Sequence, residues 1–150
     1  MTTEFQKQCA NALAKVLANT YILYLKTHNF HWNVRGPNFR SLHMMFEEQY
    51  QDMWAALDVV AERIRALGEY APGTYAKFSQ LASIKSNEDI PNAEDMVDEL
   101  IADNQAVVES ITDAIKIAQE AGDEPSAGLL TERQTIHEKA IWMMRATQAA

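Results

Sequence analysis

Four residues in the first half of the chain have the side chains and the spacing of a transition-metal site. They are His31, His43, Asp58 and Glu62, which are separated by 12, 15 and 4 positions. Imidazole and carboxylate ligands together suit ferrous iron, and so small a set leaves coordination positions open for water or peroxide. The residue types therefore indicate iron redox chemistry, provided that the fold brings them together.

A di-iron centre inside a single helical bundle is not expected. Such centres use a Glu-x-x-His pair from each of two helices. No glutamate in the sequence is followed by a histidine three residues later. Any metal site must therefore be built in another way.

Three of the candidate ligands fall on a segment with helical periodicity, from Phe39 to Leu67. On a straight helix Asp58 and Glu62 lie about 60° and 100° around from His43, on one stripe. Glu47, one turn after His43, lies on the same stripe and is a weaker candidate ligand for a second iron. However, His43 and Asp58 are about 22 Å apart along the axis, beyond the reach of ligands on one metal. One copy of this helix cannot close the site.

Two copies of the helix can close the site if they pack antiparallel across a twofold axis near residues 50 and 51. A residue of one copy then lies opposite a residue of the other copy when their numbers sum to about 101, so His43 lies opposite Asp58 of the second copy. His31 comes a few residues before the turn that leads into this helix, so it lies near the height of residue 39 and opposite Glu62 of the second copy. We therefore predict two identical sites per dimer, each with two histidines from one subunit and two carboxylates from the other.

Hydrophobic residues recur at helical spacing along almost the whole chain, which predicts an all-α protein. Gly and Pro residues divide the pattern into four long helices, and a long connection between the second and the third contains a short helix of its own. Such a crossover is typical of ferritin-like four-helix bundles. The expected helices are Glu4–Asn33, Phe39–Leu67, the short Tyr75–Leu81, one capped by Asn92 that ends at Gly122, and one that starts at Asp123–Ser126.

The composition suits one compact domain over residues 1–150, because 47% of the residues are apolar and only 5 are Gly. The 21 acidic residues against 13 Lys and Arg give a net charge of −8, which repels DNA unless the basic residues cluster. They do not cluster, and no apolar stretch approaches a membrane span. We therefore expect a soluble cytoplasmic protein that does not enter membranes. Cys9 stands alone and is expected to pack as a small apolar residue.

Several other residues have side chains that could bind a metal or transfer an electron, but packing explains their positions more simply. His28 has no acidic residue expected opposite it, and we predict that it is a packed or hydrogen-bonded histidine, as is His137. Trp32, beside His31, is either a core aromatic or a local electron donor to a redox site, and the sequence leaves both alternatives open. Core or interface packing is expected for Trp54, Trp142 and the Met pairs 44–45 and 143–144.

The candidate ligands lie in longer motifs. The run from Tyr24 to Pro37 contains His-x-x-His-Trp-Asn and ends in Gly-Pro. It is followed by Leu42-His43, by Phe46-Glu-Glu48, by Asp58-x-x-Ala-Glu62-Arg-Ile-Arg-Ala-Leu-Gly68, by Leu129-Leu-Thr-Glu-Arg133 and by His137-Glu-Lys-Ala-Ile-Trp142. Together these motifs resemble the Dps family of mini-ferritins over nearly the whole chain.

The resemblance implies an iron-storage and detoxification protein that protects against oxidative stress. It implies a hollow homododecamer with ferroxidase sites at twofold interfaces, hydrogen peroxide (or oxygen) as the oxidant, and a ferric mineral core. By the family pattern the two histidines come from one subunit, and Asp58 and Glu62 come from its neighbour. Glu47 and Glu48 would face the cavity, where carboxylates gather ferric ions.

The sequence departs from the family pattern in two places. Many members bind DNA through a terminal extension rich in Lys and Arg, and neither end of this sequence shows one, so DNA binding is not expected. Many members also line a threefold iron-entry pore with acidic residues at the start of the last helix. Asp123 and Glu124 fit this pattern, but Gly128 stands where a later Asp is expected.

Two functions compete with that of an iron enzyme and store. A DNA-compacting protein would need a basic surface, which the net charge of −8 argues against. In a purely structural helical oligomer, four aligned ligand types would be a coincidence.

Overall fold

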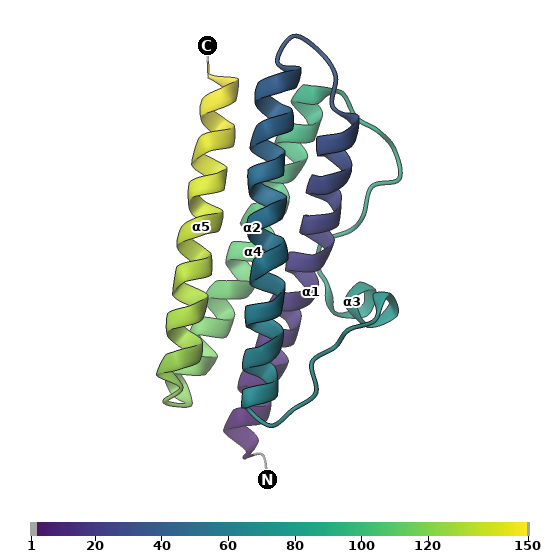
Figure 1. The fold of residues 1–150 in the computed structure, drawn as a ribbon. Helices are drawn as coiled ribbons and strands as arrows, with labels where there is room; N and C mark the ends of the chain where they lie inside the picture. The colour runs from purple at the N-terminus through teal and green to yellow at the C-terminus, as the bar shows by residue number, and fades with distance from the viewer. Residues whose placement is uncertain (1–2, 150) are drawn as a thin grey trace.

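The computed structural model describes residues 3–149, which form five α-helices and no strand. Four long helices lie side by side, and one short helix lies in the crossover on the flank of the bundle (Figure 1). The predicted all-α four-helix bundle with a short extra helix is confirmed, and within the described range no helix is long and apolar enough to cross a membrane. The helices are α1 (Glu4–Asn33), α2 (Phe39–Ala66), α3 (Tyr75–Leu81), α4 (Ala93–Glu120) and α5 (Glu124–Gln148).

The helices begin and end where local signals in the sequence predict. Thr3 accepts a hydrogen bond from the backbone N–H of Gln6, and the Gln6 side chain accepts one from the N–H of Thr3, which completes a capping box. The side-chain oxygen of Asn92 caps α4 by accepting a hydrogen bond from the backbone N–H of Asp95. Gly122 follows α4 with φ 72°, a left-handed conformation that favours glycine. Both α2 and α4 end within two residues of the expected positions.

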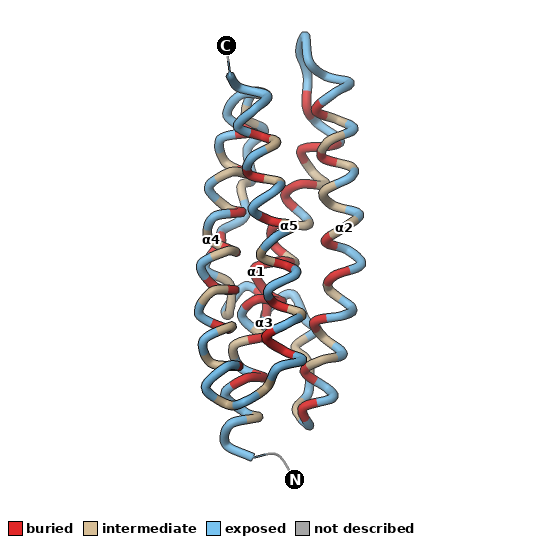
Figure 2. The backbone as a smooth tube through the Cα atoms, turned by 90° about the vertical axis from the view of Figure 1, so that its left-hand side faces the viewer, coloured by how far each residue is buried: buried red, intermediate tan, exposed pale blue. Residues whose placement is uncertain are grey.

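The core lies between the four long helices. Helix α1 packs along both α2 and α4, and α5 packs along α4, whereas α2 and α5 contact each other much less. Buried positions recur along the inward side of each long helix (Figure 2). Cys9 is buried in this core, as expected. The largest fully buried apolar side chains include Leu13, Phe30, Phe46, Met96 and Leu100.

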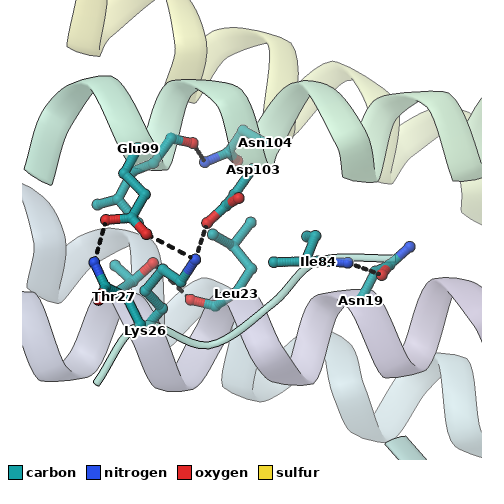
Figure 3. Close-up of polar contacts among 10 residues, drawn as sticks. Asn19, Leu23, Lys26, Thr27, Ile84, Glu99, Asp103 and Asn104 are labelled. Atoms are coloured by element: carbon teal, nitrogen blue, oxygen red, sulfur yellow. Dashed lines mark hydrogen bonds and ion pairs between the residues drawn. The ribbon is translucent and has the colours of Figure 1, made fainter. Parts of the chain in front are cut away.

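The crossover between α2 and α4 is fixed to α1 at two points. Phe78 of α3 packs on Tyr21, with ring centroids 4.7 Å apart. Beyond α3, Oδ1 of the fully buried Asn19 accepts a hydrogen bond from the backbone N–H of Ile84 at 3.3 Å (Figure 3). The same oxygen accepts one from the backbone N–H of Ser83 at 2.8 Å. These bonds satisfy the buried amide oxygen of Asn19. They hold α3 against the flank of α1.

A buried ion cluster joins α1 to α4 (Figure 3). Nζ of Lys26 lies 2.6 Å from Oδ2 of Asp103 and 3.2 Å from Oε1 of Glu99. Lys26 is only 6% exposed, and a buried ammonium is tolerated when it is paired in this way. Burial raises the pKa of Asp103, although the ammonium of Lys26 opposes that shift. The cluster fixes the register of α1 on α4 and so positions the C-terminal part of α1, which carries the candidate histidines.

Candidate metal centre

The turn between α1 and α2 brings His31 and His43 face to face. His31 lies in the last turn of α1, and His43 lies near the start of α2. Gly36, with φ 122°, helps the chain to reverse direction in the short connection 34–38. The two imidazole rings stack with centroids 3.8 Å apart and planes 13° apart. Two of the four predicted ligands are therefore adjacent within one chain.

Each of these imidazoles is held by the backbone of the other residue. Nδ1 of His31 donates to the carbonyl oxygen of His43 at 2.7 Å, and Nδ1 of His43 donates to the carbonyl oxygen of His31 at 2.7 Å. A carbonyl oxygen can only accept, so each Nδ1 carries a proton. In the neutral imidazole each Nε2 then has a free lone pair, which is the form that binds a metal.

Glu47 lies beside the same part of the histidine pair. Its Oε1 is 4.0 Å from Nε2 of His31, and its side chain is 46% exposed. This separation corresponds to two metal–ligand bonds of about 2 Å each, so one ion placed between the two atoms could contact both. The position suits Glu47 as an additional ligand beside the histidines.

Asp58 and Glu62 lie one turn apart farther along α2, and both are exposed. A hydrogen bond with Asp58, together with the charge of Asp58, raises the pKa of Glu62. The two carboxyl groups are therefore close enough to interact. A bound cation would relieve the repulsion between them.

The histidine pair and the carboxylate pair do not meet within one chain. In residues 3–149 no three His, Cys, Asp or Glu side chains are grouped so that they could hold a metal ion. Along α2, His43 and Asp58 are about 22 Å apart. Between them α2 exposes two large apolar residues, Met44 (47% exposed) and Trp54 (64% exposed), a pattern typical of a surface covered by another protein. The predicted sharing of the four ligands between two subunits requires this separation, and the sharing stays a prediction.

Comparison with known proteins gives the family. A family model described as a ferritin-like domain matches residues 10–149. The DNA protection during starvation protein of Brevibacillus brevis is 38% identical over 146 residues, which cover 97% of this chain and 98% of that protein. A crystal structure of a Dps protein from Bacillus brevis, 38% identical, superposes with a TM-score of 0.95 over 99% of this chain and 100% of that one. The chain belongs to the Dps family of mini-ferritins.

A more distant relative of known structure supports the same family. The Dps protein of Vibrio cholerae, described as a member of a broad superfamily of ferritin-like diiron-carboxylate proteins, is 29% identical. Its TM-score is 0.93 over 99% of this chain and 97% of that chain. The Dps resemblance and the ferritin-like fold expected from the sequence are both confirmed.

In this Dps chain, His28 is packed and hydrogen-bonded, as expected. Its ring contacts Tyr50 and Trp32, each with centroids 3.9 Å away, and its Nδ1 lies 3.3 Å from the hydroxyl of Tyr24. Burial, and then the neighbouring His31, lower the pKa of His28. Trp32 is 60% exposed, so the alternative that it packs as a core aromatic is wrong. The surface of α1 around Trp32 is not covered by the rest of the same chain.

His137 of the Dps chain is a structural histidine, as predicted. Its Nδ1 donates to Oδ1 of Asn104 at 2.8 Å, and its Nε2 accepts from the guanidinium of Arg133 at 3.2 Å. That guanidinium also pairs with Asp52 of α2 through hydrogen bonds of 2.9 and 3.2 Å. Burial, and then Arg133, lower the pKa of His137 to about 3. This neutral histidine links α5 to α4, and Arg133 extends the network to α2.

Asp123, a candidate pore residue, is already paired within its own subunit. Oδ1 of Asp123 lies 2.9 Å from a guanidinium nitrogen of Arg63, and the same carboxylate accepts hydrogen bonds from Ser126. Burial alone would raise the pKa of Asp123, but the bonds from Ser126 and Arg63 lower it overall. Its charge is therefore balanced inside the subunit. Glu124, in contrast, is exposed.

Proposed function

We propose that this Dps-family protein is a ferroxidase and an iron store. It oxidises ferrous iron with hydrogen peroxide at sites shared by two subunits, and it retains the ferric product inside a hollow shell of twelve copies. Membership of the Dps family and the diiron-carboxylate description of the Vibrio cholerae relative support this proposal. Iron is here a substrate and a cargo.

The observation that carries the proposal is the reciprocal hydrogen bonding of His31 and His43. The two imidazoles are stacked, and both Nδ1 protons are donated to backbone carbonyl oxygens. This leaves both Nε2 atoms free to bind a metal ion. Packing alone would not require this arrangement of protons. A neutral imidazole is also a suitable ligand for ferrous iron.

The partner subunit supplies what the histidine pair lacks. With α2 antiparallel to its copy, the partner's Asp58 comes level with His43, and the partner's Glu62 comes level with His31. Their carboxylates would offset the extra positive charge as ferrous iron becomes ferric iron, and we expect Glu47 to contribute to the binding of a second ion. Two ferrous ions then give one electron each to one peroxide. The O–O bond breaks without release of a hydroxyl radical.

A titration of the assembled, iron-free protein tests this function. Ferrous iron is added without oxygen, hydrogen peroxide is added stepwise, and ferric iron is followed by absorbance. Oxidation should be complete at one peroxide for every two ferrous ions, and the iron should co-elute with the protein shell. Oxidation no faster than in buffer alone, or ferric iron that precipitates outside the protein, would contradict the proposal.

A further inference from the structure

The seam between α2 and α5 contains a recess of about 290 Å³. These two helices run antiparallel along one side of the bundle (Figure 1), and they contact each other much less than the other pairs of long neighbours do. Side chains of both helices line the recess, together with Asn104 of α4. Protein interiors leave few voids larger than a water molecule, so the bundle leaves room for a ligand here.

Three of the side chains that line the recess are methionines. Met45 and Met53 come from α2, and Met143 comes from α5. Met53 is only 3% exposed, whereas Met45 and Met143 are half-buried. Methionine often fills gaps in a core, and the fully buried Met144 does so here, as expected from the sequence. The three methionines of the recess instead border a gap that they leave open.

The register of the two helices places two of these methionines close to each other. Arg133 of α5 pairs with Asp52 of α2 at 2.9 Å. Because the helices are antiparallel, Met143, ten residues after Arg133, lies within about one turn of Met45 along the seam. Met53 is two turns from Met45, about 12 Å along α2, so an ion that contacts all three sulfur atoms must lie between them. The long, flexible methionine side chain suits this reach.

The other potential ligands in the recess are already engaged or are charge-balanced. His137 lines the recess, but its Nδ1 donates to Asn104 and its Nε2 accepts from Arg133. The exposed side chains of Glu48 and Lys139 carry opposite charges at the same recess. Charge therefore does not favour a divalent cation. Thioether sulfur is a soft ligand, which suits monovalent copper and not ferrous iron.

We propose that the recess between α2 and α5 is a binding site for monovalent copper, Cu(I), held by Met45 and Met143 with Met53 as the third ligand. The site is separate from the candidate metal centre. Met45 and Asp52 lie about 160° and 180° around α2 from His43, on the opposite side of the helix. The inference therefore does not rest on the proposed ferroxidase function.

Competition for Cu(I) measures the site. The assembled, iron-free protein is titrated without oxygen into the coloured complex of Cu(I) with bicinchoninate, and the loss of colour reports transfer to the protein. The parent should take up one ion per subunit. Met45→Leu and Met143→Leu nearly conserve volume, and each should lower the affinity for Cu(I) about tenfold or more. Met53→Leu should lower it less. The matched control is Met96→Leu, a fully buried methionine of α4 outside the recess, which should bind as the parent does.

Two further variants exclude other Cu(I) ligands of the chain. One lacks both His31 and His43, and the other is Cys9→Ala. Both should keep the parental affinity for Cu(I), because neither change touches the recess. Loss of the bound ion in either variant would place it at the histidine pair or at the thiol and would refute the recess as the site. Size-exclusion chromatography checks that every variant remains assembled.

X-ray absorption at the copper edge identifies the ligand atoms. The loaded parent and the loaded Cys9→Ala variant should both show sulfur neighbours around copper. A first shell made only of nitrogen and oxygen would contradict the proposal. So would an unchanged affinity in the assembled double variant Met45→Leu/Met143→Leu, or a parent that takes no Cu(I) from bicinchoninate.

Discussion

His31 and His43 donate their Nδ1 protons to each other's backbone carbonyl oxygens, both at 2.7 Å, across a turn that separates them by 12 positions. Because both acceptors are backbone atoms, replacing one histidine leaves the acceptor of the other in place. Each imidazole can therefore be removed without taking away the hydrogen bond that orients its neighbour. Single substitutions at these positions test the contribution of one ligand at a time.

Replacing His31 or Asp58 by Ala should abolish fast oxidation of ferrous iron by peroxide and leave the shell assembled. Changing even a supporting residue around a metal costs about 10- to 100-fold in affinity or activity, so the loss of a ligand should cost at least as much. Stopped-flow absorbance measures the rate, and size-exclusion chromatography checks assembly. The matched control is Asp113→Ala, an exposed carboxylate on α4. Parental rates in His31→Ala or Asp58→Ala would show that the ligands are assigned wrongly.

The sharing of sites between subunits can be tested by complementation. One variant lacks both His31 and His43, the other lacks both Asp58 and Glu62, and each alone should be inactive. After unfolding, equal mixing and reassembly, about half of the twofold dimers should be mixed, and each should regain one intact site of two. Activity should therefore return to about a quarter of the parental value. A mixture that stays inactive, although mass spectrometry proves mixed dimers, would rule out the antiparallel α2 interface as the place of oxidation.

The protein should not retard duplex DNA in a gel at physiological salt and neutral pH. The net charge of −8 opposes binding to the phosphate backbone, and binding strength depends on the number of phosphates neutralised. An electrophoretic titration with the assembled shell, without added divalent metal, makes the measurement. Tight retardation would mean that assembly creates a basic patch that the charge of a single chain does not reveal.

His137 should make the folded subunit less stable as the pH falls. Its pKa is lowered to about 3 in the folded state, whereas an unfolded histidine titrates near 6.5. Above about pH 6.5 both states are neutral, and its contribution is complete. Between pH 6.5 and 3 only the unfolded state binds the proton, so stability is lost at about 1.4 kcal/mol per pH unit.

Urea unfolding at fixed protein concentration over this pH range measures the effect. His137→Gln, which does not titrate, should be less stable at neutral pH, because it disturbs the bonds to Asn104 and Arg133. Its stability should then fall less steeply with acid than that of the parent. Parallel pH profiles for the two proteins would show that His137 is not the titrating group.

The fold was predictable because its signals are local. Thr3, Asn92 and Gly122 mark helix ends by short-range chemistry, and the apolar stripe of each long helix follows from its period. The exposure of Trp32 was not predictable, since periodicity identifies an apolar position but not what covers it. The ion pair between Arg63 and Asp123 was missed because its members are 60 residues apart and meet only after α5 has packed.

The candidate centre was predictable to a similar extent. The spacing of His31, His43, Asp58 and Glu62 predicted four ligands shared between two copies, and the structure brings the two histidines together. The pairing of these histidines with Asp58 and Glu62 stays a prediction. The reciprocal backbone hydrogen bonds were not predictable, because they depend on the path of the chain at 34–38. The contact between Tyr24 and His28 spans a single helical turn, so its spacing of four was visible, but nothing in the sequence distinguished it from ordinary aromatic packing.

The weak contact between α2 and α5 has a consequence for how a subunit matures. The chain consists of two αα-hairpins, α1 with α2 and α4 with α5, whose internal contacts are local and can form quickly. The hairpins are joined mainly through α1 and α4, where Lys26 meets Asp103 across 77 residues of chain. We therefore expect the docking of one hairpin on the other to be the slow step of folding. Until docking is complete, the flank of α1 that receives α4 is open to the α4 of another subunit. We therefore expect that the characteristic folding error at high concentration is an exchange of hairpins between subunits.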